Sequence, residues 1–304
     1  MKTINRRSFL RNASLTIAGM AISGSVFAKK KYSPNLSFST LGCPSWSFTK
    51  IVSAAVEYGF NGIEIRGILK NMDITKSPEF NTPENIASSV KILEDKKLKV
   101  ICLGASTSLH FADADRRKAN LDEAKSLIDL AQKLNCPYIR VFPDKLPKDQ
   151  DRNVTMDLIM GGLRELGDYA KGSKVSVLME THGDVVKSDD LSYIMRNTGG
   201  PKIGLIWDVS NMWCDTREPV SIVYEKLKKY IKHVHFRDSM FVNGIEKSVL
   251  LGQGEVPLRE AAQLLKEDNY KGFFSFEWEK RWMPKVENPE IAFPQFAKEI
   301  RTYF

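Results

Sequence analysis

Hydrophobic and polar positions follow two alternating patterns along the chain from Leu36 onward. Short, nearly uninterrupted apolar runs are typical of strands that are covered on both faces. Longer segments with apolar residues three and four positions apart are typical of amphipathic helices, and several of them end in Gly, Asn or Lys before the next apolar run. The first pattern predicts eight strands, at 36–42, 62–67, 99–106, 138–142, 174–180, 202–208, 231–238 and 272–279.

One helical segment follows each predicted strand. The segments cover 47–59, 83–98, 115–135, 153–171, 188–197, 219–230, 257–267 and 289–304. Strict strand–helix alternation predicts a parallel sheet, and eight units in this length predict a single-domain (β/α)8 TIM barrel. The alternative is an open doubly wound sheet, although no G-x-G-x-x-G fingerprint opens the first helix. The one long connection, 239–257, is a candidate lid or substrate loop.

Residues 1–28 have the pattern of an export signal rather than of a barrel segment. Arg6 and Arg7 precede Ser-Phe-Leu, and a short apolar stretch ends at Ala28. This pattern predicts a cleaved signal, because it has a basic N-terminal region, a short apolar region and a small residue at the cleavage site. The paired arginines make it similar to the twin-arginine type. We therefore expect a periplasmic protein with its barrel in 29–304. An N-terminal membrane anchor is the alternative, but the apolar run is short for a span and rich in small residues.

Removal of this signal halves the formal net charge. The full chain carries +8, and residues 1–28 hold four of its basic residues and no acid, which leaves +4. No Lys/Arg stripe of the kind that binds nucleic acid is present. We expect neither a nucleic-acid partner nor stable membrane insertion after cleavage. The four cysteines are widely spaced, without a C-x-x-C pair, and are expected to be free.

Four side chains that can bind a metal stand at the ends of the last four predicted strands. They are Glu180, Asp208, His235 and Glu277, at spacings of 28, 27 and 42 residues (180 to 208, 208 to 235, 235 to 277). The first two spacings match one strand–helix unit, and the third matches one unit plus the long loop. Because the carboxyl ends of barrel strands converge on one face, the four should meet there. Three carboxylates would be costly to bury around one point without a cation, so we predict a metal site.

The donor set indicates both the metal and its chemistry. Three carboxylates and one imidazole favour Mn²⁺, Mg²⁺ or Co²⁺, with Zn²⁺ possible. Such an ion can hold a carbonyl and a neighbouring hydroxyl and stabilise the enediolate that forms on proton loss. Returning the proton to the opposite face is epimerisation, returning it to another carbon is isomerisation, and loss of a β-substituent is elimination. Singly, each of these residues could instead be a helix cap or a solvent-facing acid.

Further strand-end residues are candidate substrate contacts: His182, Arg237, Arg140, His110, Trp46 and Lys280. His182 can point the same way as Glu180, two residues earlier, although it could be only a turn residue. Trp46 could stack on a sugar face, and Lys280 could stabilise an oxyanion.

The two arginines have a structural alternative. Arg140 and Arg237 could bind substrate oxygens, or they could pair with Glu64 and Asp238. His233 is expected to be structural and to point away from His235 in a regular strand.

Several segments together resemble the sugar phosphate isomerase/epimerase-like, xylose isomerase-like TIM-barrel superfamily. They are "LMETHGD", "IWDVSN", "HVHFRDS", "GQGEVP" and "SFEWEKRWMP". The resemblance implies a metal bound by the four strand-end residues and proton transfer by Glu180 and Glu277. Ketose epimerase members often carry a second histidine three residues after the strand-end aspartate, where this chain has Asn211. The superfamily also includes endonuclease IV, but four histidines are too few for its three-zinc site.

The predicted export bears on the substrate. Phosphorylated sugars are mostly cytoplasmic, so a free sugar, a keto-sugar or an oxidised glycoside is the better expectation. We expect a metal-dependent isomerase or epimerase acting on such a carbohydrate. A metal-dependent lyase on 3-keto-glycosides is the alternative, and a non-catalytic sugar-binding barrel is the alternative of another class. The sequence leaves the oligomeric state open.

Overall fold

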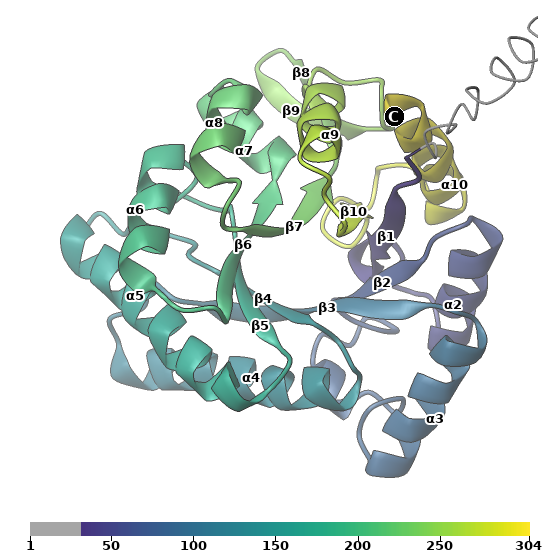
Figure 1. Ribbon diagram of the computed structural model, residues 1–304, viewed down its shortest axis with the longest axis horizontal. Coiled ribbons are helices and arrows are strands. Elements are labelled where there is room, and N and C mark those ends of the chain that lie inside the picture. Colours follow the sequence, from purple (N-terminus) through teal and green to yellow (C-terminus); the bar gives the residue numbers. More distant parts are fainter. Residues whose placement is uncertain (1–31) are drawn as a thin grey trace, which may run out of the picture. The chain divides into compact units, whose positions relative to one another are not determined.

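The eight predicted strands form a closed parallel barrel (Figure 1). The computed structural model describes residues 32–304, so the predicted export signal at 1–28 lies outside the described residues. The strand order around the barrel is β1-β10-β7-β6-β5-β4-β3-β2, and β1 closes it by pairing with both β10 and β2. The strands are β1 Asn35–Ser39, β2 Gly62–Ile65, β3 Lys99–Ser108, β4 Tyr138–Phe142, β5 Ser176–Glu180, β6 Ile203–Asp208, β7 Ile231–Phe236 and β10 Phe273–Phe276. The TIM barrel is confirmed, and the open doubly wound sheet is excluded.

Helices surround the barrel as a ring (Figure 1). They are α2 Phe48–Glu57, α3 Pro83–Asp95, α4 Ala114–Lys133, α5 Arg152–Tyr169, α6 Ser188–Thr198, α7 Val209–Thr216, α8 Val220–Leu227, α9 Leu258–Glu267 and α10 Pro289–Glu299. Several begin at a side chain that accepts a hydrogen bond from the first turn: Ser47, Thr82, Asp113, Asp151 and Asp208. None of the helices in residues 32–304 is long and apolar enough to cross a membrane.

An aromatic cluster joins the last helix to the first and last strands of the barrel. Phe276 of β10 stacks on Phe296 of α10, with ring centroids 4.4 Å apart, and Phe38 of β1 lies 4.4 Å from Phe293. All four rings are buried. Large buried aromatic side chains dominate the stability of such a contact. The cluster therefore secures the seam at which β1 and β10 close the barrel.

Two elements differ from the sequence prediction. The long connection after β7 is partly a hairpin, in which β8 Asp238–Val242 pairs antiparallel with β9 Ile245–Val249. Its turn is Asn243-Gly244, both with positive φ (53° and 77°), which is the turn pair that such hairpins prefer. The helix α7, directly after β6, was also not predicted. It begins at Asp208, whose carboxylate accepts the backbone N–H of Asn211 at 2.7 Å.

Candidate metal centre

The barrel brings the four predicted metal-binding side chains together. Glu180 ends β5, Asp208 ends β6, His235 lies in β7 opposite Asp208, and Glu277 directly follows β10. Each offers one oxygen or nitrogen atom, and these atoms all lie within 4.8 Å of one another. The residues are only 1% to 6% exposed. We call these residues the four-residue cluster. Their convergence is confirmed, and their binding of a metal stays a prediction.

The orientation of His235 fits a cation in this cluster. Nδ1 lies 3.0 Å from Glu277 Oε2 and 3.8 Å from Glu180 Oε1, yet it is buried without a hydrogen-bond partner. Nε2 lies 3.1 Å from both carboxylate oxygens of Glu64. A carboxylate at one ring nitrogen fixes the proton there and turns the lone pair of the other nitrogen toward a metal. An unpaired nitrogen among carboxylates is therefore a metal-binding arrangement.

Glu64 and His233 belong to the same buried network. His233 Nε2 lies 2.5 Å from Glu64 Oε1, and its ring centroid is 5.5 Å from that of His235. The prediction that His233 points away from His235 was wrong, because residues two apart in a strand lie on the same face. Glu64 was not predicted as part of the site. Its signal in the sequence was an acid inside the otherwise apolar second strand.

Arg140 holds Glu180 as an anion. Nη1 lies 3.0 Å from Glu180 Oε2, and both side chains are buried. Burial raises the pKa of Glu180, but the charges of Arg140 and His235 outweigh it and lower the pKa to about 2. Neither sequence interpretation of Arg140 anticipated this partner, and pairing with Glu64 was wrong. A carboxylate that stays ionised suits a metal ligand.

Asp208 has the opposite electrostatic situation. Burial and the charges of Glu277 and Glu180 raise its pKa to about 7. Three carboxylates around one point repel one another, and one of them holds its proton more tightly as a result. A divalent cation would relieve this repulsion and release the proton. The three carboxylates and the imidazole therefore fit such an ion as a donor set.

His182 and His110 lie near the rim on the same side of the barrel. His182 Nδ1 lies 3.7 Å from Asp144 Oδ1, and its ring lies 4.5 Å from that of Phe142. Burial lowers the pKa of His182, but the hydrogen bond to Asp144 and the charge of Glu180 raise it by more. The net effect is a raised pKa. His110 is buried against Phe111, and its Nδ1 has no hydrogen-bond partner. Both residues stay candidates for substrate contact.

Arg237 anchors the β8–β9 hairpin to the site. Its guanidinium lies 2.8 Å from Glu246 of the hairpin and 3.4 Å from Glu279, and it donates to Asn211 Oδ1 at 3.2 Å. The proposed pairing with Asp238 was wrong, because Asp238 accepts backbone N–H groups in the loop after the hairpin. Asn211, where ketose epimerases often carry histidine, is therefore a partner of Arg237.

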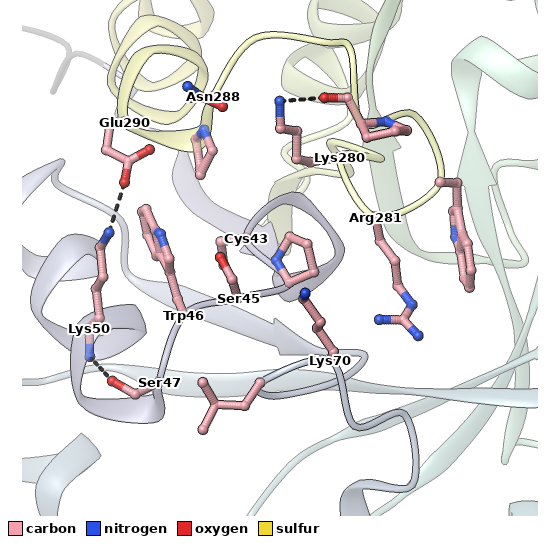
Figure 2. A pocket seen from close by; sticks show the side chains of 15 residues that line it. Cys43, Ser45, Trp46, Ser47, Lys50, Lys70, Lys280, Arg281, Asn288 and Glu290 are labelled. Carbon is pink, nitrogen blue, oxygen red and sulfur yellow. Dashed lines mark hydrogen bonds and ion pairs between the residues drawn. The ribbon is translucent and has the colours of Figure 1, made fainter.

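Trp46 and Lys280 line a separate pocket of about 980 Å³ at the ends of β1 and β10, which we call the Trp46 pocket (Figure 2). No residue of the four-residue cluster lines it. Lys280 Nζ donates to the backbone carbonyls of Pro284 and Val286, so it braces its own loop. Trp46 is buried against Phe293, with Lys50 Nζ 4.3 Å from its ring centroid. Direct contact of Lys280 or Trp46 with the cluster is not observed.

Comparison with known proteins gives the family. The sequence pattern of the family described as "Xylose isomerase-like TIM barrel" matches residues 52–298. The chain belongs to this family. The family match thus agrees with the TIM barrel and with the resemblance inferred from the strand-end motifs.

Curated relatives in the family carry three kinds of enzyme name. Fructoselysine 3-epimerase of Shigella flexneri is 23% identical over 237 residues, which are 73% of this chain and 82% of the relative. Inosose isomerase of Halalkalibacterium halodurans is 25% identical over 230 residues, 72% of this chain and 78% of the relative. Inosose dehydratase of Clostridium botulinum (strain Alaska E43) is 27% identical over 166 residues, 47% and 54% respectively. The matched relatives are therefore epimerases, isomerases and dehydratases.

Solved structures of the same fold contain divalent metal ions. The IOLI protein with a bound zinc atom has a TM-score of 0.73 and 19% identity, covering 89% of this chain and 99% of that one. A xylose isomerase-like TIM barrel protein from Mycobacterium smegmatis, in complex with magnesium, has a TM-score of 0.65 and 18% identity, covering 89% and 96%. These similarities establish the fold.

Proposed function

We propose that this protein is a divalent-metal-dependent isomerase or epimerase that acts on a sugar or keto-sugar. The observation that carries the proposal is the convergence of His235 with the buried carboxylates of Glu180, Asp208 and Glu277, whose ligand atoms lie within 4.8 Å of one another. The names of the matched epimerases and isomerases support it. In this proposal the protein works in the periplasm, because residues 1–28 resemble a twin-arginine-type export signal.

The four-residue cluster would hold one divalent ion, which would polarise a substrate carbonyl and stabilise the negative charge that develops next to it. Glu277 is the better placed base. Glu180 is ion-paired with Arg140, whereas within residues 32–304 Glu277 has no Arg or Lys partner. The basic side chain that Glu277 contacts is His235, at 3.0 Å, and in this proposal His235 binds the metal.

Proton transfer would then follow a simple course. Glu277 takes the proton from the carbon next to the carbonyl, and the electrons of that C–H bond form the double bond of an enediolate. Glu180 would return a proton to the other face; because Arg140 keeps it ionised, it must first take that proton from water, and Glu277 would release its own proton to water. Return to the same carbon inverts its configuration, and return to the neighbouring carbon moves the carbonyl group.

A lyase is the second candidate. The dehydratases among the matched relatives support it, since elimination begins with the same proton removal. The electron pair then expels a β-oxygen substituent, which leaves with a proton. His182, with its raised pKa and its partner Asp144, could supply that proton at the rim. A 3-keto-glycoside has such a substituent.

One experiment distinguishes these functions. The Mg²⁺-loaded protein is incubated in D₂O with a panel of keto-sugars and 3-keto-glycosides and followed by NMR. An epimerase introduces deuterium with inversion, an isomerase moves the carbonyl, and a lyase releases the substituent. Glu277→Gln should abolish exchange while keeping the fold, and the matched control Glu287→Gln, at an exposed position, should not. Binding without any exchange would show a sugar-binding barrel instead.

A further inference from the structure

Three arginines in the barrel are almost fully buried, and one of them has no acidic partner. Arg66, Arg140 and Arg237 are 7%, 3% and 5% exposed. Arg140 and Arg237 both form ion pairs with carboxylates. Within residues 32–304, Arg66 forms none: Nη2 donates to Ser106 Oγ at 2.9 Å, and Nη1 is buried with no partner. A buried charge with no carboxylate at ion-pair distance is costly, so Arg66 calls for an explanation.

Arg66 lies next to the four-residue cluster. It directly follows β2, and its side chain crosses Gly104 of β3. A Cβ atom on Gly104 would lie 2.4 Å from Arg66 Cδ and 2.8 Å from Arg140 Nη2. The glycine therefore makes room for Arg66 beside the arginine that holds Glu180. Burial and the charge of Arg140 lower the pKa of Arg66 to about 9, and the more distant charges of Glu123 and Glu277 only partly offset this, so Arg66 is still charged at neutral pH.

Arg66 lines a small recess together with two more cations. The recess measures about 10 Å³, which is room for about one water-sized group, and Lys70 and Arg281 also line it. In the described part of the chain neither forms an ion pair, and Arg281 Nε is buried without a hydrogen-bond partner. We call this the anion recess.

The anion recess adjoins the Trp46 pocket, because Lys70 and Arg281 line both. Figure 2 shows these two residues on the opposite side of the pocket from the ion pair of Lys50 and Glu290. The Lys50 ammonium is thus neutralised, whereas the cations of the recess are not. The unpaired positive charges of Lys70 and Arg281 therefore lie on the side of the pocket that adjoins Arg66.

We propose that Arg66, Lys70 and Arg281 bind a carboxylate group of the substrate. This rests on the proposed function, in which the carbonyl of the substrate lies at the four-residue cluster. Guanidinium groups bind carboxylates through paired N–H donors, and a carboxylate oxygen matches the size of the recess. The substrate class is then an acidic one: a keto-sugar acid, or a keto-glycoside that carries a sugar acid.

Formate tests the recess without any assumption about the sugar. The protein is freed of metal by chelation and desalting, and its thermal stability is measured in sodium formate and in sodium chloride at equal ionic strength. We expect a saturable rise in Tm with formate only. Absence of a formate-specific rise would overturn the proposal, and so would a rise with phosphate but not with formate.

Variants assign the effect to the recess. Arg66→Gln and Arg281→Gln should each weaken formate binding at least about tenfold, the loss expected for a hydrogen bond to a charged group. Arg281 is partly exposed, so its variant keeps the test valid if Arg66→Gln does not fold. Lys50→Gln, on the far side of the same pocket, is the matched control and should bind formate as the unaltered protein does. Equal weakening in Lys50→Gln, or none in Arg66→Gln and Arg281→Gln, would show adventitious binding.

Failure of the proposed function can be told apart from failure of the recess. In the deuterium-exchange assay, Arg66→Gln should raise KM for an acidic keto-sugar by a larger factor than KM for its neutral counterpart. If neutral keto-sugars exchange deuterium and acidic ones do not, the carboxylate assignment is overturned and the enzyme proposal stands. If no sugar exchanges, the enzyme proposal fails, and the formate result alone decides the recess.

Discussion

Both carboxylate oxygens of Glu64 lie 3.1 Å from Nε2 of His235. Glu64 is in β2 and His235 in β7, so the contact crosses the interior of the barrel. It orients the imidazole so that the other ring nitrogen faces Glu180 and Glu277. In this arrangement Glu64 is a positioning residue that acts on a metal through His235.

Replacement of Glu64 by glutamine should weaken metal binding without unfolding the barrel. Loss of such a supporting carboxylate typically lowers metal affinity about 10- to 100-fold, because the histidine loses its fixed orientation and some basicity. Titration calorimetry with Mn²⁺ measures the change. Asp144→Asn, which alters an acid that pairs with His182 at the rim, is the control and should keep the original affinity. Unchanged Mn²⁺ affinity in Glu64→Gln would show that Glu64 does not support a metal ligand.

Metal removal should lower thermal stability. An ion that binds only the folded chain adds about 2.7 kcal/mol to the free energy of unfolding at a concentration of about 100 Kd. Chelation should therefore lower Tm in the unaltered protein, and Mn²⁺ should restore it. The same treatment should have little effect on a His235→Gln variant. If chelation leaves the Tm of the unaltered protein unchanged, the metal-site prediction is wrong.

The metal-free protein should lose stability as pH rises from about 6 to about 8. The pKa of Asp208 is raised from 3.8 to about 7, and the pKa of His235 is raised well above 6.5. The folded state therefore holds more protons than the unfolded state in this range, so its free energy of unfolding falls with rising pH. Glu180 and Glu64, whose pKa values are lowered, are already ionised there.

Thermal denaturation across this pH range, with and without metal, checks the sign. Metal displaces the extra protons, so its affinity should rise with pH while the metal-free Tm falls. Asp208→Asn should flatten the metal-free profile, because an amide does not titrate. A metal-free Tm that rises with pH in the unaltered protein would contradict the electrostatic account of the cluster.

Arg237→Met should detach the β8–β9 hairpin from the barrel. Removal of one member of a fully buried ion pair costs about 3–5 kcal/mol, because the remaining carboxylates lose their counter-charge. Here these are the hairpin's Glu246 and Glu279. The cost here should be smaller, because the two carboxylate side chains are 34% and 28% exposed and water screens them. Limited proteolysis should show faster cleavage within the hairpin, and denaturant unfolding should show the lost stability. Lys247→Ala, an exposed hairpin change, is the control, and equal cleavage rates for Arg237→Met and this control would argue against the anchoring role.

Local pattern was enough to predict the barrel and the convergence of Glu180, Asp208, His235 and Glu277. The spacing of apolar residues follows the geometry of strands and helices, and parallel strands in a barrel end on one face. The Asn243-Gly244 pair is also a hairpin signal in the sequence, within the segment predicted as a long connection. What these features share is that they depend on residues close together along the chain or on the common direction of the strands.

Only the tertiary structure decided which charged side chains are partners. Glu64 meets His233 and His235 across 169 and 171 positions of sequence, and Arg140 meets Glu180 across 40. These contacts depend on the stagger of the strands and on which side chains fill the barrel interior, and a one-dimensional pattern contains neither. The buried Arg66 without an acid partner is visible only once every neighbouring carboxylate has been placed in space.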